Sequence, residues 1–179
     1  MHTILVFLNN MSIDKIENIR QKHDPLFELI PPHITIVFPF KSNISNGELK
    51  SHILNLSRGI GKIEIEFANR ITSVGNYLFL EVERGKEQIA KLHDMLYTEP
   101  LRQFLKEDIP YIPHVTVGRK ESAELAAEVA KDIHSFPQKL QCVIDRISVE
   151  RIGENGESII EFEVPLQKAD KSQLFLFVA

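Results

Sequence analysis

The chain has 179 residues, with 21 Lys and Arg against 25 Asp and Glu, a formal net charge of −4, and 43% hydrophobic residues. This length fits one domain or two small lobes that share a cleft, and the composition is typical of globular proteins rather than disordered or membrane chains. The acidic excess excludes a global positive field that would attract long duplex nucleic acid, but leaves a small anionic substrate open. The lone cysteine, Cys142, cannot form an internal disulfide, and the apolar run at 4–8 is too short for a signal or membrane segment. We therefore expect a cytoplasmic protein.

The first half of the chain predicts the order β-α-β-α-β. Alternating or β-branched apolar residues indicate strands, and apolar residues three or four apart indicate helices. The helix at 47–58 has Leu49, Ile53, Leu54 and Leu56 on its expected apolar side, and the Gly75-Asn76 pair predicts a hairpin turn. The expected elements are strands at 3–8, 33–39, 62–72 and 77–82, and helices from an N-cap at Ser12 and over 47–58.

The second half repeats this order. Its expected elements are a helix over 86–97, a strand at 112–119, a helix over 122–133 and strands at 140–149 and 159–164. Pro-His-Ile-Thr-Ile at 32–36 matches Pro-His-Val-Thr-Val at 113–117, 81 residues later, and Asn-Arg-Ile-Thr at 69–72 matches Asp-Arg-Ile-Ser at 145–148, 76 residues later. Two copies are too few for a solenoid, so the repeat predicts a pseudo-symmetric pair of lobes.

Two His-x-Thr triplets, His33 with Thr35 and His114 with Thr116, carry the chemistry. Residues i and i+2 of a strand point to one side, so each strand presents an imidazole beside a hydroxyl. Seven histidines and five threonines would give about 0.2 such triplets by chance, so two with matching flanks indicate function. A neutral imidazole and a protonated one can act as base and acid at a phosphorus atom, while the hydroxyls bind its oxygens. This chemistry needs no metal, and Cys142 supplies no zinc-type cluster.

The paired triplets, one in each half of a duplicated chain of this size, resemble the 2H phosphoesterase superfamily, above all its LigT-like group of 2′-5′ RNA ligases and cyclic phosphodiesterases. The resemblance extends from the first strand to about Leu166. It implies a bilobal α+β fold of duplicated β-α-β-α-β units, with antiparallel sheets around a central cleft. It also implies metal-independent hydrolysis or reversible formation of 2′,3′-cyclic phosphates or 2′-5′ phosphodiester bonds, with His33 and His114 as the acid–base pair and Thr35 and Thr116 positioning the phosphate. Which histidine is the acid stays open.

Arg119 is a candidate substrate-binding residue, because its guanidinium could neutralise phosphate charge and because a basic residue often follows the second motif in the family it resembles. Strand parity turns it away from the face of Thr116, unless a β-bulge intervenes at Gly118. The first half has Phe38 at the equivalent position, so the two half-sites are not expected to be identical.

Aromatic residues near the motifs are further substrate-binding candidates. Tyr77 and Phe79 alternate with leucines at 78 and 80, so one set faces the cleft and the other faces the helices. Aromatic rings in the cleft would stack a base, whereas aromatic residues in strands are commonly core residues. Phe40 and Tyr111 border the motif strands and are candidate rim residues.

The remaining charged and titratable residues carry no predicted role. Arg70 and Arg146 occupy matching positions of the repeat, and solvated strand charges account for them. The other histidines lack a partner threonine and are assigned no function: His2, His23, His52, His93 and His134.

We therefore expect one domain over residues 1–179, with a small nucleotide or an RNA terminus as substrate, no cofactor, no metal, no long duplex nucleic acid and no membrane partner. The tail at 167–179 turns from polar to apolar and is either an added strand, a flexible end or a contact to a second subunit of an otherwise monomeric protein. Two alternative functions stay open. One is a non-catalytic module that binds a phosphorylated ligand or an RNA end, and the other is a phosphoesterase for a non-nucleotide metabolite.

Overall fold

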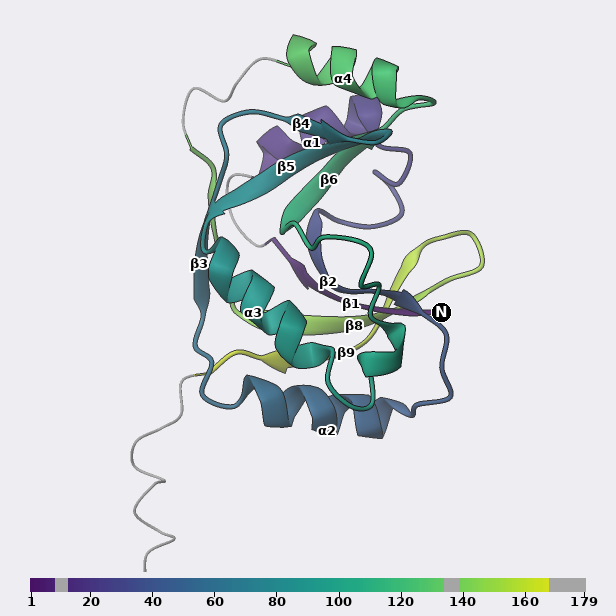
Figure 1. Cartoon of the computed structure of the whole chain (residues 1–179), viewed down its shortest axis with the longest axis vertical. Coiled ribbons are helices and arrows are strands. Elements are labelled where there is room, and N and C mark those ends of the chain that lie inside the picture. The colour runs from purple at the N-terminus through teal and green to yellow at the C-terminus, as the bar shows by residue number, and fades with distance from the viewer. Residues whose placement is uncertain (9–12, 134–138, 168–179) are drawn as a thin grey trace, which may run out of the picture.

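The computed structural model describes residues 1–8, 13–133 and 139–167, and its elements follow the predicted order (Figure 1). The strands are β1 (His2–Phe7), β2 (His33–Phe40), β3 (Ile63–Phe67), β4 (Thr72–Val74), β5 (Tyr77–Arg84), β6 (His114–Arg119), β7 (Gln141–Ile144), β8 (Arg146–Ile152) and β9 (Ser158–Pro165). The helices are α1 (Ile13–His23), α2 (Asn46–Ser57), α3 (Lys86–Leu96) and α4 (Ala123–Asp132), with a 3-10 turn η1 (Arg102–Phe104). The predicted cap Ser12 and the tail from residue 168 lie outside the described residues.

Within the described residues, the strands form one antiparallel sheet in the order β7-β3-β5-β6-β2-β1-β8-β9, and β4 adds to the edge of β5. The two His-x-Thr strands, β2 and β6, are neighbours at its centre and are joined by one pair, Ile34 with Val115. The predicted α+β class with antiparallel strands is confirmed.

The sheet curls back on itself. Strand β7 lies at one end of the strand order and β8 lies near the other end, yet only Asp145 separates them in the chain. The two ends of the sheet must therefore approach one another, and the Leu166 amide, just after β9, donates to the carbonyl of Asp145. The strand expected at 140–149 is accordingly two strands with different partners, because the chain passes from one end of the sheet to the other at Asp145.

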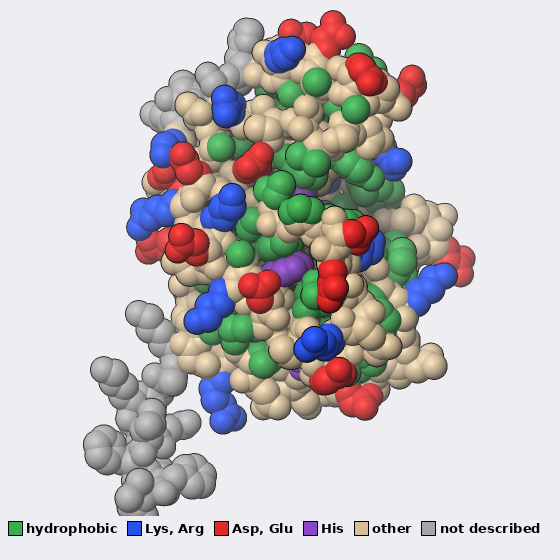
Figure 2. Space-filling model, viewed as in Figure 1, with side chains coloured by type: hydrophobic (Ala, Val, Ile, Leu, Met, Phe, Trp, Pro, Cys, Tyr) green, Lys and Arg blue, Asp and Glu red, His purple; other side chains and the backbone are tan. Residues whose placement is uncertain are grey.

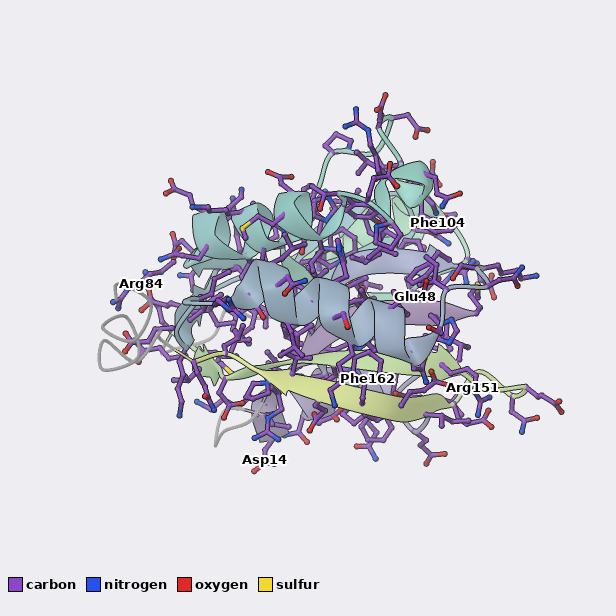
Figure 3. The ribbon with its side chains drawn as sticks, turned by 90° about the horizontal axis from the view of Figure 1, so that it is seen from below. Asp14, Glu48, Arg84, Phe104, Arg151 and Phe162 are labelled. Carbon is purple, nitrogen blue, oxygen red and sulfur yellow. The ribbon has the colours of Figure 1, made fainter. Side chains whose placement is uncertain are left out.

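The helices cover the sheet reciprocally. Helix α1 of the first half packs against β6 of the second half, and helix α3 of the second half packs against β2 of the first half. Helix α4 packs against β4 and β5, and α2 packs against β9 and α3. Figure 1 shows α1 and α4 with β4, β5 and β6 in its upper part, and Figure 3 shows α2 from below, between α3 and β9. Each half of the repeat therefore helps to bury the other.

Local sequence explains how α2 begins and which side it buries. Ser45 forms a capping box: its hydroxyl accepts from the amide of Glu48, whose carboxylate accepts from the amide of Ser45. Leu49 and Ile53, one turn apart, are fully buried. The prediction that Leu54 belongs to the apolar side is wrong, because one further residue turns its side chain by about 100° and leaves it 46% exposed.

The strand expected at 62–72 is also interrupted. Residues 63–67 pair with β5 and β7, whereas residues 72–74 pair only with β5, through the expected hairpin at Gly75-Asn76. Gly75 has a φ of 54°, which glycine adopts without a steric penalty.

Candidate active site

The register between β2 and β6 brings the two His-x-Thr triplets together. Ile34 pairs with Val115, and both are buried. In an antiparallel pair this register places His33 opposite Thr116, and Thr35 opposite His114. All four side chains are half-buried and lie on the other face of the two strands from Ile34 and Val115. Residues 81 positions apart in the chain therefore share one small area of the sheet.

Both imidazoles are held in the same orientation. The Nδ1 atom of His33 lies 2.9 Å from the carbonyl oxygen of Pro31, and that of His114 lies 2.5 Å from the carbonyl oxygen of Ile112. A carbonyl oxygen can only accept a hydrogen bond, so each Nδ1 carries a proton. In both rings Nε2 is then the nitrogen that exchanges a proton, as a base when the ring is neutral and as an acid when it is charged.

Burial lowers the pKa of both histidines. For His33, desolvation outweighs the hydrogen bond to Pro31, which favours the charged ring, and the charge of His114 lowers the pKa further. For His114, desolvation lowers the pKa against the opposing effects of the bond to Ile112 and the carboxylate of Glu81. The charge of His114 acts on His33 because the two strands that carry these rings are neighbours in the sheet.

Each His-x-Thr strand contains a bulge at the residue after its threonine. In β6, Thr116 pairs with Phe79 and Gly118 pairs with Leu78, so Val117 is an extra residue. In β2, Thr35 pairs with Leu5 and Val37 pairs with Ile4, so Ile36 is an extra residue. Ile36 and Val117 occupy equivalent positions of the repeat, and the two bulges are therefore part of the duplicated unit.

The bulge in β6 reverses the alternation of side chains and determines where Arg119 points. Val117 and Gly118 are both buried, and Arg119 then pairs with Tyr77, on the same face as Phe79 and Thr116. The guanidinium carbon of Arg119 lies 5.3 Å from the centre of the Tyr77 ring. Arg119 is thus on the side of the sheet that carries the His-x-Thr residues, as the bulge alternative requires.

The aromatic residues of β5 share this face. Leu78 and Leu80 are fully buried, so Tyr77 and Phe79 take the opposite side of the strand. The Phe79 ring stacks on His114, with centroids 3.5 Å apart and planes inclined by 21°. Tyr77 is 38% exposed. Figure 2 shows hydrophobic and histidine side chains across the middle of the face seen in Figure 1.

Strand β2 pairs with β6 only at Ile34, and side chains from the second half bond to its backbone beyond that pair. His93 Nδ1 lies 2.7 Å from the carbonyl oxygen of Ile36, and the Tyr97 hydroxyl accepts from the amide of Phe38. His93 was assigned no function from sequence, and it is a buried residue that braces this strand.

Tyr111 braces the same strand. Its hydroxyl donates to the carbonyl oxygen of Thr35 at 2.8 Å, and its ring stacks on His93 with centroids 3.7 Å apart. The other candidate rim residue, Phe40, is 3% exposed and packs against Phe104. The prediction of Phe40 as a rim residue is therefore wrong, because its side chain belongs to the core.

Sequence reasoning missed Glu81, which pairs directly with His114 across β5 and β6. The sequence does contain a signal for Glu81, since Glu81 continues the alternation of Tyr77 and Phe79 along one face of the strand.

Arg146 has ion-pair partners in Asp145 and Glu163. Over the described ranges, no group of three or more His, Cys, Asp or Glu is placed to hold a metal ion. The helices described here are all too short to cross a bilayer.

Comparisons with known proteins find relatives that align over most of this chain. A 27% identical protein of Bacillus licheniformis, provisionally named a phosphoesterase, aligns with 86% of this chain and 90% of its own length. The crystal structure of TT0787 from Thermus thermophilus has a TM-score of 0.67 at 14% identity, over 94% of this chain and 99% of that one. E. coli LigT in complex with 3′-AMP has a TM-score of 0.65 at 14% identity, over 93% and 98%. The family model of the 2′-5′ RNA ligase superfamily matches residues 9–156. The chain therefore belongs to the 2′-5′ RNA ligase superfamily, the 2H phosphoesterases.

Proposed function

We propose that this protein hydrolyses 2′,3′-cyclic phosphates of nucleotides or RNA ends by two-histidine acid–base catalysis. The observation that supports this function best is the pair of imidazoles on facing strands, each with its Nδ1 fixed by a carbonyl oxygen two residues earlier. Both Nε2 atoms then have the same freedom to accept or donate a proton. Two such groups are what displacement at phosphorus requires, one for the attacking oxygen and one for the leaving oxygen.

In the proposed reaction a water molecule attacks the cyclic phosphate. One Nε2 takes a proton from this water while the other donates a proton to the departing ribose oxygen. The hydroxyls of Thr35 and Thr116 donate to the non-bridging phosphate oxygens, and Arg119 compensates their charge. The product is a nucleoside phosphate with one ester bond. A 2′-5′ bond forms when the 5′-hydroxyl of a second ribose attacks the cyclic phosphate in place of water, while the bond from phosphorus to O3′ breaks and O3′ takes the proton.

A nucleotide is the substrate class that the relatives support. E. coli LigT has been crystallised with 3′-AMP, with NADP⁺ and with ATP, and the last two structures have TM-scores of 0.63 and 0.54 to this chain. In this chain, the exposed ring of Tyr77 beside Arg119 offers a surface on which a base could stack.

The test is a panel of 2′,3′-cyclic nucleotides, 2′-5′ dinucleotides and 3′-5′ controls, with the product isomers separated by chromatography. We expect turnover of the first two classes, insensitive to EDTA, and a bell-shaped dependence of kcat/KM on pH. His33→Ala and His114→Ala should each lower kcat about 10²- to 10⁴-fold.

His52→Ala is the matched control, because His52 is also half-buried with a ring nitrogen 2.9 Å from a carbonyl oxygen, that of Leu96, but lies on α2. It should retain full activity. Binding of the panel without turnover by the folded wild-type protein would contradict the proposal and indicate a non-catalytic binding module.

A further inference from the structure

The two halves of the site differ in what lies across from each histidine. On β5, the residue that pairs with His114 is Glu81. On β1, the residue that pairs with His33 is Phe7, whose ring meets the imidazole edge-on with centroids 6.3 Å apart. A carboxylate therefore stands beside one imidazole where an apolar ring stands beside the other, and the repeat is not symmetric in its charges.

The carboxylate beside His114 is held in place. Glu81 is half-buried, and its Oε1 accepts a hydrogen bond of 2.6 Å from the hydroxyl of Thr72 on β4. Its negative charge raises the pKa of His114 against the effect of burial. The stacked ring of Phe79 on the same imidazole also favours a cation over its face.

The surroundings of His33 favour a neutral ring. Three charged side chains act on it: Arg20 on α1 lowers its pKa, Asp24 just after α1 raises it, and His114 on β6 lowers it. The carboxylate of Asp24 is already paired with the buried guanidinium of Arg20, at 2.8 Å. That acid is thus compensated by its own partner, whereas Glu81 is bonded to a neutral hydroxyl.

We infer that Glu81 is a positioning residue that assigns the two roles, with His114 as the general acid and His33 as the general base. This inference rests on the proposed function. In hydrolysis, His33 Nε2 takes a proton from water as the water oxygen bonds to phosphorus. The bond from phosphorus to the ribose oxygen breaks, and that oxygen keeps the electron pair and takes the proton of His114 Nε2. One water is consumed, and exchange with solvent restores both rings.

The test is Glu81→Gln, whose amide oxygen can still accept from Thr72. A base must be deprotonated and an acid protonated, so His33 sets the acidic limb of the kcat/KM profile and His114 sets the alkaline limb. We expect the substitution to move the alkaline limb to lower pH and to leave the acidic limb in place. Above the moved limb, kcat/KM should fall by about tenfold per pH unit.

The matched control is Glu83→Gln, the same change two residues along β5 at an exposed carboxylate paired with Lys139. It should move neither limb. Movement of the acidic limb in Glu81→Gln would reverse the assignment, and an unchanged profile would remove Glu81 from the mechanism.

A second measurement separates this inference from the proposed function. NMR titration of the histidine ring protons reports protonation without any substrate, and Glu81→Gln should shift the His114 titration to lower pH. If the wild type turns over none of the panel, the proposed function fails, and the titration still decides whether Glu81 controls His114. A His114 titration that is the same in both proteins would overturn the inference.

Discussion

Gly118→Ala should destabilise the protein, because Gly118 of β6 lies against His23, the last residue of α1. An added Cβ would lie 2.8 Å from the Cβ of His23 and 2.8 Å from Cδ1 of Leu78, with the carbonyl oxygen of His23 at 3.0 Å. Carbon atoms pack best at about 3.5–4.0 Å, so these neighbours would have to move by roughly 1 Å. Overpacking of this kind costs about 1–3 kcal/mol.

Activity should fall as well, because the strand is the easier part to displace. The end of α1 is anchored by Arg20, which is buried and bonds to Asp24, to Glu17 and to the carbonyl oxygen of Ile30. We therefore expect β6 to yield, and a shift of about 1 Å in a strand that carries His114 can lower kcat by up to about 100-fold.

Urea unfolding and turnover of a cyclic nucleotide measure the two effects. Gly47→Ala is the matched control, because its nearest neighbour to an added Cβ is 3.9 Å away, in the first turn of α2. Alanine there should be neutral or stabilise the protein by up to about 1 kcal/mol. A Gly118→Ala protein within about 0.5 kcal/mol of the wild type and fully active would refute the reasoning.

Three further predictions concern single side chains. Ser45→Ala removes the capping box with Glu48 and should lower the free energy of unfolding by about 1 kcal/mol in urea, whereas an unchanged midpoint would contradict the role of the cap. Tyr111→Phe removes the bond to the Thr35 carbonyl and should lower the free energy of unfolding by about 1 kcal/mol in the same assay, and an unchanged midpoint would contradict a stabilising role for this bond. Burial raises the pKa of Glu150 above 4.5, so the folded state holds this proton more firmly than the unfolded chain, and this group adds stability as pH falls through its raised pKa. Glu150→Gln should unfold at higher urea than the wild type at pH 8, and the two midpoints should converge toward pH 4.5.

The sequence predicted what depends on local periodicity. The His-x-Thr strands followed from alternation, and the helices followed from apolar spacing. A bulge inserts one residue without altering composition, so the position of Arg119 could not be decided from parity. The alternation in β5 predicts that Glu81 lies on one face with Tyr77 and Phe79. Only the pairing of β5 with β6 shows that Glu81 lies beside His114.

The pairing partners of the strands could not be predicted from local sequence either. Apolar residues alternate at 140, 142 and 144 and, in the opposite phase, at 147 and 149, but this pattern does not show that β7 pairs with β3 and β8 pairs with β1. The change of partner at Asp145 depends on the curl of the whole sheet, which is set by contacts between residues far apart in the chain. Likewise, nothing local distinguishes His93, which braces the backbone of β2, from a solvent-exposed helix histidine.

The reciprocal covering of the sheet by α1 and α3 has a consequence for the integrity of the chain. A cut at the Gly75-Asn76 turn would leave one fragment with α1 but without β6, and with β2 but without α3. Neither fragment could bury its own apolar surface, so we expect each fragment to be unfolded alone and the two to reassemble on mixing. An ancestor of half this length would also have needed a second copy to bury its apolar surface. As a symmetric dimer it would have carried two equivalent imidazoles related by the twofold axis. Glu81 and Phe7 would then mark where fusion allowed the two copies to diverge.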